Sequence, residues 1–286
     1  MSGPLKFGLI GHNISYSKSA DIFNAIFDIT GINGSFEVFN LDPNNFEREF
    51  KAVIDKGING LSVTIPYKSR VIPLLNDVAP ITLSLDAVNS IAIKDGKLLG
   101  YNTDITAFAR PLIQHIQQLK NKIALILGYG GGAKAAIFSL HTNFQLSQFI
   151  NRGRNLKKIA EFQRSQKEIY PDPGGVFSNL GEFKFDDSVK FAIVVNCTPL
   201  GGPNHTDESP LPVGFKWHMT DIYYDLNYNS DNQTIREAAK NNVIAIDGSQ
   251  MLVGQAIRSF EIWTGETVNF DEVYSRVFGQ AKSYSA

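Results

Sequence analysis

The feature that most constrains this chain is a glycine-rich run, Gly128-Tyr129-Gly130-Gly131-Gly132, lying between two segments of different periodicity. The apolar run Ile123–Leu127 before it is typical of a buried strand, and Ala133–Leu140 after it is typical of a helix. Glycines at such a junction allow a tight turn and a close approach to a ligand, while free amides at the helix start attract a diphosphate. The run therefore predicts a dinucleotide site in a doubly wound sheet of the Rossmann type.

The choice between NAD and NADP depends on the end of the next strand, about 20 residues further on. That place holds Asn151-Arg152-Gly153-Arg154, which has two arginines and no acidic residue. An acidic side chain would bind an unphosphorylated ribose, whereas guanidinium groups suit a 2'-phosphate. We therefore expect NADP as the cofactor, bound in part by Arg152 and Arg154. The alternative is that both arginines are solvated surface charges.

The N-terminal part alternates strand and helix patterns before it changes direction. Its predicted parallel strands are Lys6–Ile10, Ser35–Asn40 and Leu61–Ile65. Two further strand-like runs flank Asp95-Gly96, the dipeptide most favourable to a two-residue hairpin. The pattern therefore predicts a mixed sheet with an antiparallel hairpin.

The rest of the chain returns to strict βα alternation. The further predicted strands are Gln148–Ile150, Phe191–Asn196, Met219–Tyr224 and Val243–Ile246. Asp104 is expected to cap a helix that runs to about Leu119, kinked or broken at Pro111, and the tail from Gln250 to about Lys282 reads as helical throughout. We predict an α/β protein of two domains. Residues 1–104 with 249–286 would form a mixed-sheet substrate domain, and residues 105–248 a Rossmann-type NADP domain.

Charge and cysteine content exclude several classes of protein. Lys and Arg total 27 against 28 Asp and Glu, so no strong field favours nucleic acid or an anionic membrane, and we expect a small-molecule partner. The single cysteine, Cys197, excludes an intramolecular disulfide and fits a reducing compartment, so we expect a cytoplasmic protein. The five histidines show no ligand spacing, and no metal is expected. A monomer and a homodimer both remain open.

Polar side chains gather at the ends of the first-domain strands, where ligands of open α/β sheets bind. They are Ser17, Ser19, Thr64, Lys68, Asn89, Asn102 and Asp104. Hydroxyls, amides, one ammonium and one carboxylate suit a small, acidic, polyhydroxylated molecule. Taken singly, each residue also has a structural explanation, such as helix capping by Ser17, Ser19 or Asp104.

These residues and others give the chain a resemblance that runs nearly from end to end. The matching stretches are Ser17-Lys18-Ser19, Val63-Thr64-Ile65-Pro66-Tyr67-Lys68, Ala87-Val88-Asn89-Ser90, Asn102-Thr103-Asp104, Gly128 to Ala133, Asn151-Arg152, Asn196-Cys197-Thr198, and Gly248 through Met251-Leu252-Val253-Gly254-Gln255 to Trp263-Thr264-Gly265. In these motifs and their order the chain resembles the shikimate dehydrogenase family.

The resemblance implies NADP-dependent, reversible reduction of 3-dehydroshikimate to shikimate, a step toward chorismate and the aromatic amino acids. It implies that Lys68 is the catalytic acid/base and Asp104 its partner. The implied substrate-binding residues are Ser17, Ser19, Thr64, Asn89, Asp104 and Gln255. The implied cofactor-binding residues are Gly128, Gly130, Gly131, Gly132, Ala133, Asn151, Arg152, Arg154, Thr198, Tyr224 and Gly248, the last two near the nicotinamide or the substrate ring.

Several positions depart from the family's usual pattern without removing a catalytic group. Tyr16 and Ser62 stand where His and Asn are usual, and both are placed to alter the ring pocket. Asp225-Leu226 replaces the usual Asn-Pro after Tyr224, and Gly153 replaces Thr after Asn-Arg. Two alternatives therefore stay open: a quinate/shikimate dehydrogenase of broad specificity, and a catalytically weak NADP-binding sensor.

Overall fold

The computed structural model describes residues 3–146, 148–153, 155–169, 189–211, 215–228 and 232–279. The chain divides into two compact units. Of the described residues, those up to Ala107 and those from Leu252 onward form unit 1, and those from Phe108 to Met251 form unit 2. The two junctions lie three residues beyond the boundaries expected at 104 and 248.

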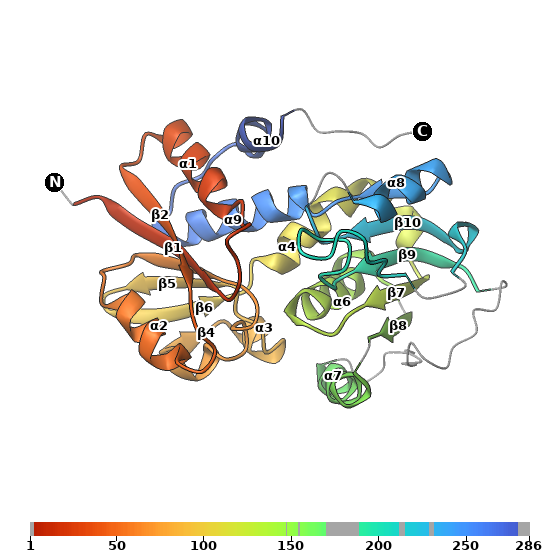
Figure 1. The fold of residues 1–286 in the computed structure, drawn as a ribbon, viewed down its shortest axis with the longest axis horizontal. Coiled ribbons are helices and arrows are strands. Elements are labelled where there is room, and N and C mark those ends of the chain that lie inside the picture. Colours follow the sequence, from red (N-terminus) through yellow and green to blue (C-terminus); the bar gives the residue numbers. More distant parts are fainter. Residues whose placement is uncertain are drawn as a thin grey trace. The chain divides into compact units, whose positions relative to one another are not determined.

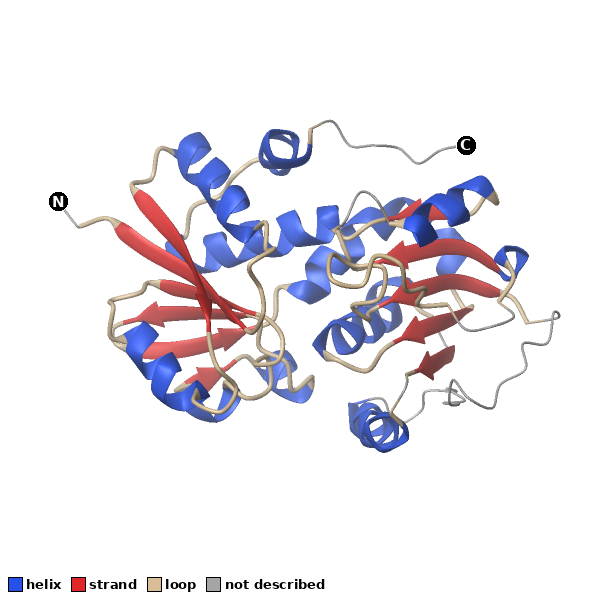
Figure 2. Ribbon diagram, viewed as in Figure 1, coloured by secondary structure: helices blue, strands red, loops and turns tan. Residues whose placement is uncertain are grey.

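Unit 1 contains a mixed sheet of six strands in the order β2-β1-β3-β5-β6-β4 (Figures 1 and 2). The strands are β1 (Leu5–Gly11), β2 (Gly34–Asn40), β3 (Gly60–Val63), β4 (Asp77–Val78), β5 (Ser90–Lys94) and β6 (Lys97–Tyr101). Strand β1 pairs in parallel with β2 and β3, β5 pairs antiparallel with β3 and β6, and β4 lies parallel to β6. The expected mixed sheet is confirmed, with the short β4 as a strand that the sequence pattern did not predict.

The β5–β6 hairpin confirms the turn predicted at Asp95-Gly96. Both turn residues have positive φ, 51° for Asp95 and 73° for Gly96. This is the pattern of a type I′ turn, whose twist matches that of the flanking strands. The hairpin pairs Lys94 with Lys97 and continues to Ser90 opposite Tyr101. It therefore brings the start of β5 and the end of β6 to the same place.

Helices cover both faces of the unit 1 sheet. They are α1 (Ser19–Thr30), α2 (Phe46–Ile54), α3 (Pro80–Ser84), α4 (Asp104–Ala109), α9 (Ser249–Thr264) and α10 (Phe270–Phe278). Buried residues of α1, α9 and α10 form one core with Phe7 and Ala92. Residues of α2 form a second core with Leu61, Val63 and Ile91 of the sheet. The strands thus send alternate side chains to two separate cores.

The packing of α9 on the sheet explains one glycine. The Trp263 ring stacks on Phe7 with ring centroids 5.1 Å apart, and a Cβ on Gly60 would overlap the indole. A side chain at this point of β3 would lift the helix off the sheet. Phe260 of the same helix belongs to this core as well.

Two predicted helices differ from the structure in extent. The segment from Asp104 to Leu119 consists of α4, a 3₁₀ helix (Arg110–His115) and α5 (Ile116–Leu119), so the break expected at Pro111 is confirmed. The tail is not one helix, because Gly265 at φ 81° separates α9 from α10. A further 3₁₀ turn, Ile72–Leu74, lies between β3 and β4.

Unit 2 contains a parallel sheet of five strands in the order β11-β10-β9-β7-β8. The strands are β7 (Ile123–Leu127), β8 (Gln148–Arg152), β9 (Phe191–Asn196), β10 (Thr220–Asp225) and β11 (Ile244–Ile246). The helices include α6 (Gly131–Phe144), α7 (Leu156–Ile169), α8 (Gln233–Lys240) and a 3₁₀ turn (Trp217–Met219). Strand β7, the first of the unit, lies between β8 and β9. The carboxyl end of β7 is therefore a topological switch point, where α/β sheets bind ligands.

Candidate active site

The polar clusters of unit 1 lie at one edge of its sheet because of the strand directions. Strands β1 and β3 are parallel and end at Gly11 and Val63, and β5 begins at this same edge because it is antiparallel to β3. The backbone confirms the meeting, since Val63 donates to the Asn89 carbonyl and Asn89 donates to the Tyr101 carbonyl. Segments more than 80 residues apart in the chain thereby converge on one edge.

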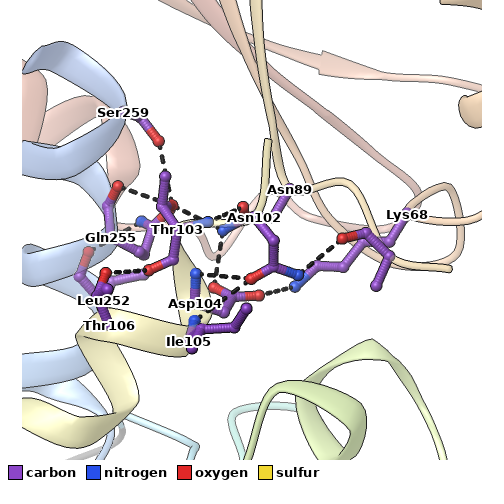
Figure 3. Close-up of polar contacts among 11 residues, drawn as sticks. Lys68, Asn89, Asn102, Thr103, Asp104, Ile105, Thr106, Leu252, Gln255 and Ser259 are labelled. Atoms are coloured by element: carbon purple, nitrogen blue, oxygen red, sulfur yellow. Dashed lines mark hydrogen bonds and ion pairs between the residues drawn. The ribbon is translucent and has the colours of Figure 1, made fainter. Parts of the chain in front are cut away.

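At this edge the Lys68 ammonium meets the Asp104 carboxylate (Figure 3). Lys68 Nζ donates to Asp104 Oδ2 at 2.6 Å, and the two side chains are 18% and 7% exposed. A charge-assisted hydrogen bond with this little solvent is screened far less than a surface ion pair. The structure therefore joins the two residues that were expected to carry the chemistry.

Asn89 fixes the orientation of Asp104. Its amide donates to Asp104 Oδ1 at 2.8 Å and to Thr103 Oγ1 at 2.9 Å, while its oxygen accepts from the Thr103 backbone at 2.6 Å. Both amide hydrogens of this side chain, which is only 2% exposed, are used within the protein. These contacts position Asp104, and the expected contact of Asn89 with substrate stays a prediction.

Asn102 is a residue whose role the sequence analysis missed. Its side-chain oxygen accepts from the backbone N–H groups of Asp104 at 3.0 Å and Ile105 at 3.3 Å, and its amide donates to the Ala87 carbonyl at 2.7 Å. It therefore satisfies the free donors in the first turn of α4. The expectation that Asp104 caps this helix is wrong, and capping by Asn102 leaves the Asp104 carboxylate available to Lys68.

Thr103 was also missed, and it ties this cluster to α9 (Figure 3). Its hydroxyl donates to the Gln255 carbonyl at 3.1 Å and lies 3.3 Å from Ser259 Oγ. The Gln255 side chain itself donates to the Leu252 carbonyl at 2.9 Å. The signal in the sequence was faint, because a buried threonine beside an aspartate has many possible roles. Substrate binding by Gln255 stays a prediction.

The remaining predicted substrate residues lie at the ends of β1 and β3. Ser17 Oγ donates to Ser19 Oγ at 3.0 Å, and the Ser19 backbone donates to Ser17 Oγ at 3.2 Å at the start of α1. The Thr64 backbone carbonyl accepts from the Tyr67 N–H at 2.9 Å in the turn that leads to Lys68. The Thr64 methyl group lies close to Gly11, because a Cβ added to Gly11 would be only 2.6 Å from it. Their binding roles stay predictions.

In unit 2 the glycine run forms the loop between β7 and α6. Gly128 has φ 110°, and a Cβ there would lie 3.1 Å from the Cys197 backbone, so this position requires glycine. Gly130 precedes α6, whose first turn has no side-chain cap, and a Cβ on Gly130 would meet no atom within 4 Å. Open space beside uncapped helical amides is what a dinucleotide diphosphate needs. The loop residues Gly128 to Ala133 therefore fit the expected cofactor.

Asn151 and Arg152 end β8 next to this loop. The Asn151 amide donates to the Gly128 carbonyl at 2.5 Å, so this buried side chain holds the glycine loop in shape. The Arg152 side chain is 0% exposed, and burial lowers its pKa to about 10, which leaves it protonated near neutral pH. It is therefore not a solvated surface charge. Arg154 lies outside the described residues, and phosphate binding by both arginines stays a prediction.

The other predicted cofactor residues follow β9, β10 and β11. Thr198 Oγ1 donates to Asn196 Oδ1 at 2.7 Å, and the Gly248 backbone donates to the Asn227 carbonyl at 2.8 Å. Tyr224 is buried and stacks on Phe108 with ring centroids 4.9 Å apart. All three lie at or just beyond the carboxyl ends of the parallel strands, and contact with a nicotinamide stays a prediction.

The described part of the chain holds neither a cluster of metal ligands nor a helix suited to a membrane. Among residues 3–146, 148–153, 155–169, 189–211, 215–228 and 232–279, no three His, Cys, Asp or Glu side chains gather as metal ligands do. None of the helices in those ranges has the length and hydropathy that a membrane span requires.

Comparisons with known proteins agree with the geometry. Residues 9–91 match the shikimate dehydrogenase substrate binding domain, and residues 248–278 match the shikimate 5'-dehydrogenase C-terminal domain. The chain is 35% identical to a shikimate dehydrogenase (NADP(+)) of Chlorobaculum tepidum, over 95% of this chain and 94% of that protein. A crystal structure of shikimate dehydrogenase 1 from Peptoclostridium difficile has a TM-score of 0.81 and 28% identity, covering 96% of this chain and 97% of that one. A shikimate dehydrogenase solved in complex with NADP+ has a TM-score of 0.82 and 31% identity, covering 96% and 94%.

Proposed function

The chain belongs to the shikimate dehydrogenase family, and from this we propose that it interconverts 3-dehydroshikimate and shikimate with NADP, using Lys68 as acid/base and Asp104 as its partner. The observation that carries the catalytic assignment is the 2.6 Å bond between Lys68 Nζ and Asp104 Oδ2. Unit 1 would bind the substrate, and the glycine loop of unit 2 would bind the dinucleotide. Arg152 and Arg154 would favour NADP over NAD.

In the oxidation of shikimate, the bound NADP+ supplies the hydride acceptor. The reacting alcohol loses hydride from its carbon and a proton from its oxygen, and the carbonyl group forms as both leave. Lys68 in its neutral form would take the oxygen's proton, and in the reverse reaction its ammonium would return it. Asp104, held by Asn89, would orient both the amine and the substrate hydroxyl. The Ser17 and Ser19 hydroxyls would donate to the substrate carboxylate.

The decisive assay measures NADP reduction with shikimate and with quinate side by side, and repeats both with NAD. Turnover with shikimate and NADP is the expected result. Comparable efficiency with quinate would instead assign a dehydrogenase of broad specificity. Cofactor binding without turnover on either substrate would refute the proposed activity and favour an NADP-binding sensor.

Two further expectations belong to this proposal. A biosynthetic dehydrogenase whose single cysteine, Cys197, forms no intramolecular disulfide fits the reducing cytoplasm. Its assembly would be a monomer or a homodimer, which light scattering coupled to size-exclusion chromatography would distinguish.

A further inference from the structure

One buried carboxylate of unit 2 has no part in the chemistry described so far. Asp225, the last residue of β10, is 0% exposed. Its oxygens accept from the Asn196 amide at 3.0 Å, the Asn227 backbone at 2.9 Å, the Asn227 amide at 2.8 Å, the Asn232 amide at 2.7 Å and the Tyr223 hydroxyl at 3.0 Å. A cluster of this kind requires an explanation, because isolated buried charges are costly.

The hydrogen-bond partners show which form of Asp225 this cluster suits. Four of these five partners are N–H groups, which can only donate, and the fifth is the Tyr223 hydroxyl, which donates here; the cluster therefore matches a carboxylate better than a protonated carboxyl group. Among the described residues of unit 2, Asp225 forms no ion pair with Lys or Arg. Burial raises the pKa of Asp225, and the amide donors oppose that effect. The donors therefore offset part of the cost of burying the Asp225 carboxylate, whose charge is not neutralised by Lys or Arg within the described part of unit 2.

The position of this charge in the sheet relates it to the cofactor site. Leu127, Asn196 and Asp225 are neighbours in register at the carboxyl ends of β7, β9 and β10. The glycine loop begins directly after Leu127. The charge also affects the neighbouring loop, since burial and then the charge of Asp225 raise the pKa of the Cys197 thiol. Asp225 thus lies at the ligand-binding edge of the sheet.

Asn227 connects Asp225 to the residues expected around the nicotinamide. The Asn227 amide that donates to Asp225 also donates to the carbonyls of Thr198 at 3.1 Å and Leu200 at 3.2 Å, and the Asn227 carbonyl accepts from Gly248. A single residue, Asn227, therefore links the buried carboxylate to Thr198 through its side chain and to Gly248 through its backbone. Tyr224, the third expected neighbour of the ring, directly precedes Asp225 in the chain.

We propose that Asp225 is a specificity-determining residue whose buried negative charge strengthens binding of oxidised NADP+ relative to reduced NADPH. The nicotinamide ring carries a positive charge only when it is oxidised, so a nearby buried anion attracts one form and not the other. Repulsion between Asp225 and the cofactor phosphates is common to both forms and cancels in their ratio. The inference rests on the proposed function, because it needs a nicotinamide cofactor in unit 2.

The test compares dissociation constants for NADP+ and NADPH, measured by fluorescence or calorimetric titration of the full chain without substrate. Asp225→Asn removes the charge and keeps the size of the side chain. We expect it to weaken NADP+ about fivefold more than NADPH. A purely structural role would weaken both cofactors alike, so a change in the ratio below about twofold would overturn the inference.

Tyr223→Phe is a second, milder variant of the same cluster, and it keeps the test possible if Asp225→Asn does not fold. It removes the hydroxyl that donates to Asp225 Oδ2, so the charged form of Asp225 loses one stabilising donor. We expect its preference for NADP+ to fall in the same direction as that of Asp225→Asn, by a smaller factor. A preference shifted toward NADP+ in this variant would also overturn the inference.

The two proposals fail in different ways. A wild-type protein that binds neither NADP+ nor NADPH would contradict the proposed function and the inference together. A wild-type protein that binds both, with an Asp225→Asn variant that keeps the wild-type ratio, would contradict the inference alone.

Discussion

Lys68 and Asp104, 36 residues apart in the chain, form a hydrogen-bonded ion pair of 2.6 Å within unit 1. The pair depends on a third residue, because Asn89 holds the other carboxylate oxygen of Asp104. The arrangement presents an amine on a carboxylate of fixed orientation, which suits proton transfer to and from an alcohol.

Lys68→Ala should lower kcat for shikimate oxidation by about 10²- to 10⁴-fold, because no other group would accept the hydroxyl proton. KM for shikimate should change far less, since the amine acts mainly in the transition state. Steady-state kinetics with NADP would measure both. Lys51→Ala is the control: it breaks the exposed Lys51–Asp55 ion pair of 2.7 Å and should leave the kinetics unchanged. Near-normal turnover in Lys68→Ala would refute the assigned role.

Asn89→Ala should reduce the free energy of unfolding by about 1–3 kcal/mol, because it leaves the Thr103 N–H and Asp104 Oδ1 without their partner in a buried site. It should also lower kcat, since Asp104 loses its fixed orientation. Urea denaturation followed by circular dichroism would give the first value. Asn24→Ala, on the exposed side of α1, is the control and should not destabilise the protein. Equal stability of the two variants would contradict this account of Asn89.

Two alanine substitutions in the glycine loop should have different effects. Gly130→Ala should leave thermal stability nearly unchanged, because the new Cβ meets no atom within 4 Å, yet it should weaken NADP binding by placing a methyl group where the diphosphate approaches. Gly128→Ala should lower the melting temperature, because φ is 110° there and the Cys197 backbone lies 3.1 Å away. Thermal melts and NADP titrations of both variants would decide. Unchanged NADP affinity in Gly130→Ala would count against a diphosphate site.

Arg154→Ala should weaken NADP about tenfold and leave NAD affinity unchanged, since only NADP carries the 2'-phosphate. Arg152→Ala should also lower the free energy of unfolding, because the Arg152 side chain is fully buried. With a pKa of about 10, Arg152 keeps its charge up to about pH 9. At any pH below about 9, loss of the Arg152 charge should therefore not weaken NADP binding. Titrations with both cofactors at several pH values would test this. Equal losses of NADP and NAD affinity in Arg154→Ala would refute selection by the phosphate.

The buried Asp225 predicts a pH-dependent difference in stability between the wild type and Asp225→Asn. Burial raises the pKa of Asp225 above its unfolded value, so the folded protein binds this proton more readily than the unfolded chain. Such a group stabilises the fold most below its unfolded pKa, and the stabilisation is lost as the pH rises through the raised pKa. The stability of the wild type relative to Asp225→Asn should therefore fall as the pH rises from about 4. Denaturation series at matched pH values would measure the difference, and an increase would contradict the raised pKa.

Local sequence determined the elements whose signals are short-range. The glycine run between an apolar strand and a helix pattern identified the β7–α6 junction, and Asp95-Gly96 identified the hairpin, because both depend on backbone conformations that few residues adopt. The break at Pro111 was predictable for the same reason. Alternating βα periodicity was enough to predict a parallel sheet in unit 2.

Only the tertiary structure decided which polar side chains pair with one another and which role each one takes. Asp104, Asn102 and Asn89 are all plausible caps or ligands in the sequence, and the fold assigns capping to Asn102, support to Asn89 and the ion pair to Asp104. In the same way it buried Arg152 and surrounded Asp225 with donors from Asn196, Asn227 and Asn232. The physical reason is that periodicity reports which face of an element is apolar, whereas a polar partnership depends on which strand ends meet at one edge of a sheet, and that is set by long-range pairing.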